Sequence, residues 1–200
     1  MGMLGSNDFN LPSHDSNAFN TLLLQYEAYA GISNPTQHLE FFNVFYTMAK
    51  AALQYGTIFP DTDGQRVFHY ENYRLYHMVD LCKESFKRRY HHDNFIYLCH
   101  PAIITICQYD QKHKTDYFKI IYTYLSNNCN VVQSAQVLNY HRNTLQNKLA
   151  RIKKIIGLPL DSAVLNSTLY FSCIVIKYFI EYEHKNILDY SADSLENIDI

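Results

Sequence analysis

The side chains with the most distinctive chemistry in this 200-residue chain are the amides and cations between residues 141 and 154. A side-chain amide can form two hydrogen bonds with the edge of an adenine, and Lys or Arg can bind phosphate. Four apolar residues recur in the same stretch at i, i+4, i+7 and i+11, a spacing typical of one buried helix face: Leu145, Leu149, Ile152 and Ile156. The opposite face carries no acid and consists of Asn143, Asn147, Ala150 and Lys154. This pattern predicts a helix that contacts a polyanion.

Two further short helices are predicted before this one, within the segment Tyr117 to Leu158. Val131 to Leu138 is the second helix, and its Ala135 is small enough for the point where two helices cross. Asn139 follows where the turn needs a left-handed backbone, which Asn tolerates better than most residues. Three helices joined in this way predict a DNA-binding helix-turn-helix.

Capping residues are predicted at both ends of these helices. Asn130 is the candidate cap of the second helix, a role worth about 1 kcal/mol. His141 begins the third helix, where its side chain can satisfy free N–H groups, and Tyr140 is expected to pack beneath the turn. Gly157 and Leu158 close the third helix.

A family resemblance rests on Asn128-Cys129-Asn130-Val131, on His141-Arg142-Asn143-Thr144-Leu145 and on the residues in register with them: Ala135, Leu138, Leu149, Arg151 and Ile152. At these positions the sequence resembles the C-terminal helix-turn-helix of the PucR/CdaR class of bacterial transcription regulators. The family often has Ser at position 132 and Arg at positions 146, 148 and 150, where this chain has Val, Gln, Lys and Ala. These departures concern phosphate affinity more than fold.

The resemblance and the outward positions together imply nine DNA-binding residues: His141, Arg142, Asn143, Thr144, Gln146, Asn147, Lys148, Arg151 and Lys154. The predicted base-contacting residues among them are Asn143, Gln146 and Asn147. The predicted phosphate-contacting residues are Arg151 and Lys154, while Arg142 suits either role. Lys153 lies nearer the apolar face and is ranked below them.

The charge of the chain is distributed unevenly. Its net charge is −2, yet residues 111–155 hold eight Lys or Arg against one acid, Asp116, and therefore carry +7. The remainder carries −9, so the positive charge is concentrated where the motif lies. A local basic region is typical of a phosphate-binding surface, although an ordinary solvated basic helix has the same composition. The motif favours the first interpretation.

Other patterns argue against an enzyme. The five cysteines are odd in number and include no C-x-x-C pair, which indicates neither a disulfide framework nor a zinc site and fits a reducing cytoplasm. His91, His92, Cys99 and His100 match no common metal spacing, and Asp61-Thr62-Asp63-Gly64 is expected to be a turn rather than a calcium loop. We therefore expect no catalytic residues, no metal and no cofactor.

A membrane segment is not expected either. The longest apolar run, Leu169 to Ile180, is interrupted by Lys177. It is also shorter than the ~20 residues that a helix needs to span a bilayer.

The fold class expected is mostly α, with a small α+β N-terminal part and a C-terminal helix-turn-helix bundle. Composition and periodicity divide the chain into a loose N-terminal segment (1–17), an α+β regulatory or dimerisation part (18–109), the DNA-binding domain (110–182) and an acidic tail (183–200). The predicted strands are Leu22 to Tyr29 and Arg66 to Tyr70. The further predicted helices are Leu39 to Tyr55, Tyr73 to Tyr90, Cys99 to Tyr109 and Val164 to Tyr182.

Three local features go with these elements. Gly56 is expected to end the helix at 39–55 in a left-handed conformation. Thr115 and Asp116 are expected to cap the first helix of the motif, and Asp161 or Ser162 the last helix of the chain.

A weaker resemblance concerns the N-terminal part. Gly31-Ile32-Ser33 and the following helix, with Tyr46, Ala49, Ala51-Ala52-Leu53 and Gly56, resemble the back half of the catalytically degenerate, cyclase-like domain of CdaR-type regulators. The front half of such a domain is not in this chain. This part is therefore either a remnant or a truncation.

The function expected is sequence-specific transcription regulation through binding of double-stranded DNA as a homodimer in the cytoplasm. A small-molecule effector could act through a missing or separate sensor domain. The alternative is a protein-interaction or effector-sensing module that keeps the helix-turn-helix fold without binding DNA. The helices at 39–55 and 164–182 either pair the subunits or cover the α+β core.

Overall fold

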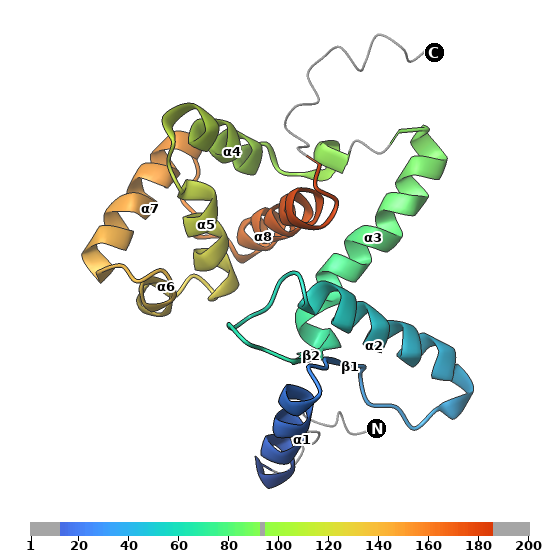
Figure 1. Ribbon diagram of the computed structural model, residues 1–200. Coiled ribbons are helices and arrows are strands. Elements are labelled where there is room, and N and C mark those ends of the chain that lie inside the picture. Colours follow the sequence, from blue (N-terminus) through green and yellow to red (C-terminus); the bar gives the residue numbers. More distant parts are fainter. Residues whose placement is uncertain (1–12, 93–94, 186–200) are drawn as a thin grey trace. The chain divides into compact units, whose positions relative to one another are not determined.

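The computed structural model describes residues 13–92 and 95–185. The described chain is mostly helical with a two-stranded sheet near its N-terminus, which confirms the predicted fold class (Figure 1). It divides into two compact units, Met1–Asp80 and Leu81–Ile200, whose boundary falls within helix α3 (Tyr70–Tyr90). The domain boundaries expected at residues 17, 109 and 182 remain predictions.

The first unit is a β–α–β arrangement preceded by a helix. Its elements are α1 (Ser13–Gln25), β1 (Ala30–Ile32), η1 (Leu39–Phe41), α2 (Phe42–Gly56), β2 (Val67–His69) and the first part of α3. The two strands pair in parallel, with Ala30 opposite Val67 and Ile32 opposite His69. A parallel pair needs a crossover connection, and α2 provides it. The buried side chains of this unit are mainly aromatic and include Tyr55, Phe59, Phe68, Tyr73 and Tyr76.

The strand predicted at residues 22–29 is wrong, whereas the one predicted at 66–70 is confirmed by β2. Residues 13–25 form α1, because Phe19 and Leu23 lie four residues apart and both turn inward, Leu23 with only 7% exposure. The helix ends at Gln25, the left-handed Glu27 turns the chain, and the strand begins only at Ala30. The predicted loose segment therefore becomes helical at Ser13, and its residues 1–12 lie outside the described part.

Two glycines allow close backbone contacts in this unit. A Cβ atom on Gly31 of β1 would lie 2.0 Å from the carbonyl oxygen of Ala49, so α2 can cross β1 only at a glycine. Gly56 was expected as a left-handed stop, but it is the last residue of α2, and its Cβ would lie 2.2 Å from Phe68 Cγ. Its role is packing against β2, and the expected conformation is wrong.

Helix α2 is only partly the core helix that its apolar sequence predicts. Ala51, Ala52 and Tyr55 in its C-terminal half are buried. At the other end, Phe42, the first residue of the helix, is 66% exposed, and the preceding Phe41 is 54% exposed. Apolar side chains in the first two turns of this helix are therefore exposed to solvent.

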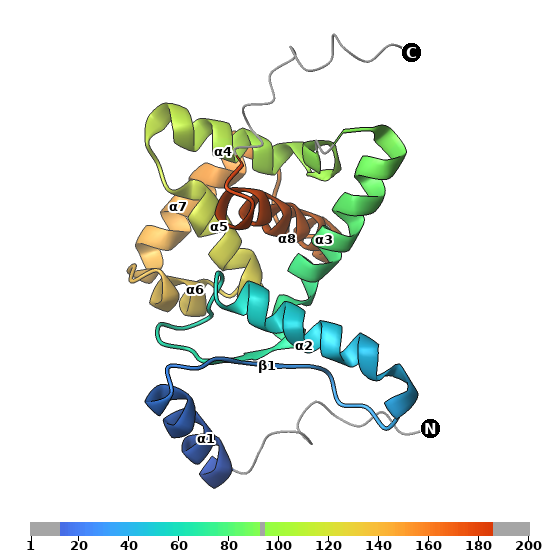
Figure 2. The same ribbon diagram turned by 45° about the vertical axis from the view of Figure 1, so that its right-hand side comes forward.

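The second unit is helical throughout the part that the structure describes. Its elements are the end of α3, η2 (Phe95–Leu98), α4 (Pro101–His113), α5 (Tyr117–Ser126), α6 (Val131–Val137), α7 (Arg142–Ile156), α8 (Ala163–Lys177) and η3 (Tyr178–Tyr182). Helix α8 packs against α4, α5 and η2, and Figures 1 and 2 show α7 on the other side of α5. Ser162, one of the two expected caps, accepts a hydrogen bond from Leu165 N and begins α8.

Helix α8 and the wider turn η3 together form a 20-residue apolar helix, Ala163–Tyr182. The sequence-based argument that this segment is too short to cross a membrane is therefore wrong. Length and composition are weak evidence, because the core helix of a soluble protein has the same properties. Leu169, Cys173 and Val175 are fully buried within the unit, which is the position of a core helix.

Glu183, the first residue of the predicted tail, has partners within the second unit. Glu183 forms an ion pair with Lys83 of α3 at 2.6 Å and accepts a hydrogen bond from Tyr178. Burial raises the pKa of Glu183, but the neighbouring Lys83 outweighs it and holds the pKa below its usual value. Glu183 thus belongs to the folded unit, and residues 186–200 lie outside the described part.

Replacing Gly31 by Ala should destabilise the first unit. The added Cβ meets the backbone of Ala49 and Leu53, which cannot move independently of α2, so we expect a loss of about 3 kcal/mol in the free energy of unfolding. Urea unfolding followed by circular dichroism measures it. Gly64→Ala is the control: its Cβ meets no atom within 4 Å, and only left-handed strain of about 1 kcal/mol applies. Equal losses in both variants would contradict the close approach.

Candidate nucleic-acid interface

The turn between α6 and α7 has the geometry predicted from the sequence. Asn139 is left-handed, with φ +54°. Tyr140 N donates to Ala135 O at 2.8 Å and Asn139 N to Gln136 O at 3.1 Å, which is the paired pattern that closes many helices. Ala135 is 4% exposed. The small side chain and the left-handed Asn together let α7 cross α6 directly after a short turn.

The turn between α5 and α6 repeats this pattern. Asn128 is left-handed, and Cys129 N donates to Tyr124 O at 2.9 Å. The Asn130 side chain then accepts hydrogen bonds from the backbone N–H groups of Val132 and Gln133, at 3.0 and 3.2 Å. This confirms Asn130 as the cap of the second helix.

Helix α7 buries one stripe and exposes the opposite one. Leu145, Leu149 and Ile152 are at most 5% exposed, and Ile156 is half-buried. The four residues predicted on the opposite face are all exposed: Asn143, Asn147, Ala150 and Lys154. Gly157, with φ +68°, ends the helix as expected.

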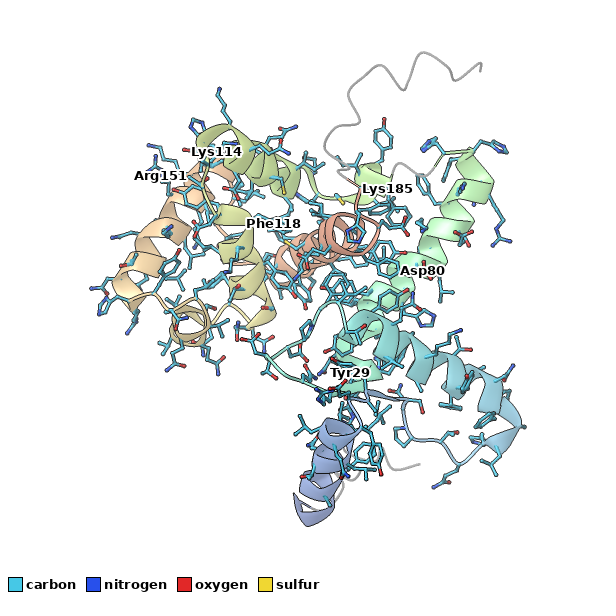
Figure 3. The ribbon with its side chains drawn as sticks, viewed as in Figure 1. Tyr29, Asp80, Lys114, Phe118, Arg151 and Lys185 are labelled. Atoms are coloured by element: carbon cyan, nitrogen blue, oxygen red, sulfur yellow. The ribbon has the colours of Figure 1, made fainter. Side chains whose placement is uncertain are left out.

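The structure places eight of the nine predicted DNA-binding residues on one exposed surface. His141 caps α7, its Nδ1 accepting from Asn143 N at 3.3 Å. The other exposed members are Arg142, Asn143, Thr144, Gln146, Asn147, Arg151 and Lys154. Arg151 lies on the outer side of α7, away from α8 (Figure 3). These eight residues are called the α7 surface below.

Lys148, the ninth residue, has a different environment. Its ammonium lies 2.9 Å from Asp116 Oδ1, and the Tyr140 hydroxyl donates to Asp116 Oδ2 at 2.6 Å. The ammonium also lies 5.0 Å from the centre of the Tyr140 ring and 5.8 Å from that of Tyr117. This network, called the Asp116 network, joins the start of α5, the turn and α7.

The network shifts the titration of its members. Burial raises the pKa of Asp116, but the hydrogen bonds from Tyr140 and Lys148 outweigh it and place this pKa below its ordinary value of 3.8. The hydrogen bond to the carboxylate raises the pKa of Tyr140. Burial lowers the pKa of Lys148, but the bond to Asp116 outweighs it, and the pKa is raised. At neutral pH the network is therefore an ion pair that holds a neutral tyrosine.

The cap of α5 was not foreseen. Asp116 precedes the helix as expected but forms no side-chain cap. Asp110 of α4 does so instead, accepting from Tyr117 N at 3.0 Å and from Phe118 N at 2.7 Å. Thr115 Oγ1 donates to the same carboxylate. The left-handed Lys114 turns the chain back, which brings Asp110 to a helix that begins seven residues later.

The Asp116 network could have been predicted in part from the sequence, because Asp116 is the one acid in the basic segment 111–155. A lone carboxylate among eight cations of residues 111–155 has a high chance of an ion pair. Its partner, 32 residues away, depends on how α5 and α7 pack.

Metal ligation has no visible basis within residues 13–92 and 95–185. No three His, Cys, Asp or Glu side chains of these residues come together in a way that could hold a metal ion. The buried thiols of Cys99 and Cys107 lie in apolar surroundings, and burial raises the pKa of each to about 12. Both thiols are therefore protonated at neutral pH and poor nucleophiles.

The Asp116 network predicts a pH-dependent contribution to stability. A carboxyl whose pKa is lowered by folding stabilises the fold above its unfolded pKa, and this stabilisation is lost as pH falls through the folded pKa. Because the pair is partly exposed and screened by water, we expect wild type to exceed Asp116→Asn by at most about 1 kcal/mol at pH 7. As pH falls below 3.8 the difference should shrink, and it should vanish below the lowered pKa of the folded state.

Urea unfolding at several pH values measures this difference. Lys148→Met should lose most of the same increment, because the carboxylate then lacks its cation. A difference between wild type and Asp116→Asn that does not change with pH would contradict the role of the ion pair.

Comparisons with known proteins agree with this geometry. Residues 117–175 match the model of the PucR C-terminal helix-turn-helix domain, from the start of α5 into α8. A DNA-binding transcriptional activator, AdeR of Bacillus subtilis (strain 168), is 24% identical over 143 residues. The match covers 72% of this chain but only 31% of AdeR. No solved structure matches.

These matches confirm the resemblance seen in the sequence. The turns, the caps and the two faces of α7 fall inside the matched segment. Residues 117–175 are therefore similar to the PucR C-terminal helix-turn-helix domain, in the segment that contains α5, α6, α7 and most of α8.

Proposed function

We propose that this chain is a transcription regulator that binds double-stranded DNA sequence-specifically, with α7 in the major groove. The observation that carries this proposal is the α7 surface, where amides and cations are exposed on a helix without a single acidic residue. A helix of this kind fits the width of the major groove and the negative charge of the backbone. The description of AdeR as a DNA-binding transcriptional activator supports it.

The members of the α7 surface have different proposed roles. Asn143, Gln146 and Asn147 bind base edges, because their amides are exposed near the start of the helix. The proposed phosphate-binding residues are Arg142, Arg151 and Lys154. Thr144 and the cap residue His141 lie at the helix N-terminus, where free N–H groups favour an anion. Lys148 acts as a positioning residue through Asp116 instead of binding phosphate itself.

Binding as a homodimer is part of the proposal. One copy offers three exposed cations on α7, and a single recognition helix covers only a few base pairs. A second copy about one turn of the DNA helix away would double the number of cations and the number of base pairs contacted. Specific binding at physiological salt requires this larger contact. An intracellular location follows from the regulator family, and we propose the cytoplasm. An effector would act through a missing or separate sensor domain.

The competing proposal is a module that keeps this fold without binding DNA. The pairing of Lys148 favours it, because one expected phosphate contact is already neutralised. Both proposals are non-enzymatic, as is typical of helix-turn-helix regulators. Salt dependence separates them, since phosphate contacts release counterions and an apolar interface does not.

Arg151→Ala should reduce the salt dependence of DNA binding. The loss of one phosphate contact lowers the slope of log K against log salt by about 0.9, so the proposed dimer, which loses one contact in each copy, should lose about 1.8. Fluorescence anisotropy of a labelled genomic fragment that the chain retains measures the slope. Arg88→Ala is the matched control, because Arg88 is also exposed but lies on α3. An unchanged slope in Arg151→Ala would remove this residue from the phosphate contacts.

Asn143→Ala and Asn147→Ala should each reduce sequence preference. Loss of a bidentate contact to adenine costs about 1–3 kcal/mol of discrimination between specific and random DNA. Competition of the retained fragment against random duplex measures this discrimination. Gln133→Ala removes an exposed amide from α6 and should leave the ratio unchanged. Equal weakening on both duplexes would show that the asparagines do not bind base edges.

A further inference from the structure

The turn between α4 and α5 carries two lysines that are not part of the α7 surface. Lys112 lies in the last turn of α4, and Lys114 follows this helix with a left-handed backbone, φ +54°. Both side chains are exposed. Neither forms an ion pair with any side chain of residues 13–92 and 95–185. Their charges are therefore directed to solvent.

The two acids at this turn are bound to other groups. Asp110 accepts hydrogen bonds from two backbone N–H groups at the start of α5, at 3.0 and 2.7 Å. Asp116 forms its ion pair with Lys148 at 2.9 Å. These contacts also fix the turn in place, because Asp110 joins the end of α4 to α5 and Asp116 joins the start of α5 to α7. The two lysines are thus held at a defined position beside α7.

Arg151 lies on the edge of α7 that faces this turn. It follows Lys148 by three residues, and residues at this spacing are neighbours on one side of a helix. Lys148 in turn contacts Asp116, two residues after Lys114. Helix α4 packs against α7, and Lys114 lies beside the part of α7 that carries Arg151 (Figure 3). Three exposed cations therefore form one basic edge: Lys112, Lys114 and Arg151.

A helix with its side chains is about 10–12 Å wide, and the major groove is about 12 Å wide. When α7 lies in the groove, residues beside its edge therefore meet the phosphates that border the groove. We infer that Lys112 and Lys114 bind the DNA backbone that borders the major groove on the Arg151 side. The inference rests on the proposed function, because it starts from α7 in the groove. It adds two phosphate contacts from a second element to those of α7 in each copy.

Local structure explains only one of the two lysines. A cation in the last turn of a helix stabilises the C-terminal end of the helix dipole, which accounts for Lys112. Lys114 lies beyond the helix in a left-handed conformation where Gly or Asn is the usual residue, so the turn itself gains nothing from a lysine. The neighbouring Gln111 faces a different side of α4, where it lines a hollow with Ile180 and Lys185. A positive charge at position 114 is what phosphate binding requires.

Salt titration of the full chain on a short duplex that holds one copy tests this inference. Lys114→Gly removes the charge and suits the left-handed backbone, so the variant should fold normally, which circular dichroism checks. Combined with Lys112→Gln, it removes two contacts and should lower the slope of log K against log salt by about 1.8. The preference for the retained fragment over random duplex should not change, because phosphate contacts carry no sequence information. Fluorescence anisotropy measures both quantities.

Two control variants show whether position and charge both matter. Lys87→Gln is the matched control, because Lys87 is an exposed lysine in the last turn of α3, and its slope should equal that of wild type. Lys114→Arg keeps the charge and should also keep the wild-type slope.

The outcomes separate this inference from the proposed function. An unchanged slope in the double variant, while Arg151→Ala lowers it, would overturn the inference and leave the proposed function in place. An equal fall in Lys87→Gln would also overturn it, because the effect would then follow net charge and not position. Failure of wild type to bind any duplex would overturn both.

Discussion

Burial of the apolar stripe of α7 is the constraint on which the rest of the domain depends. Leu145 and Ile152 are fully buried and Leu149 nearly so, and each such side chain contributes about 1.5–3 kcal/mol. The Asp116–Lys148 ion pair, partly exposed to water, contributes at most about 1 kcal/mol. The apolar stripe therefore decides which face of α7 points outward, and the Asp116 network adjusts its position relative to α5. Exposure of the amides and cations is the consequence of this packing.

The turns before α6 and α7, which make this packing possible, each contain a residue with a strained, left-handed backbone. Asn128 and Asn139 both occupy the left-handed region, where a residue with a Cβ loses about 1–2 kcal/mol. Both turns recover part of this through paired backbone hydrogen bonds to the preceding helix, and Asn130 and His141 then cap the next helix. Gly157, which has no Cβ, ends α7 without this strain.

Local sequence patterns were sufficient where one helix or turn decides the structure. The stripe of α7, the cap at Asn130 and the left-handed Asn139 depend on residues within a few positions of one another, so they could be predicted. The cap of α5 could not, because Asp110 reaches it only through the left-handed Lys114. The pairing of Lys148 and the close approach at Gly31 depend on elements far apart in the sequence. The strand predicted at Leu22 to Tyr29 was wrong for another reason. Leu23 is the only buried residue of three consecutive leucines, so the alternating period of a strand does not describe this segment.

The central claim is that the outward face of α7 binds DNA, and NMR titration with a retained genomic duplex tests it most directly. The side-chain amide signals of Asn143, Gln146 and Asn147 should shift, while those of Gln133 on α6 and Gln111 on α4 should shift little. The backbone signals of Leu145 and Ile152 should follow more weakly, since these residues face the core. Shifts confined to α2 or α4, with the three α7 amides unchanged, would contradict the account.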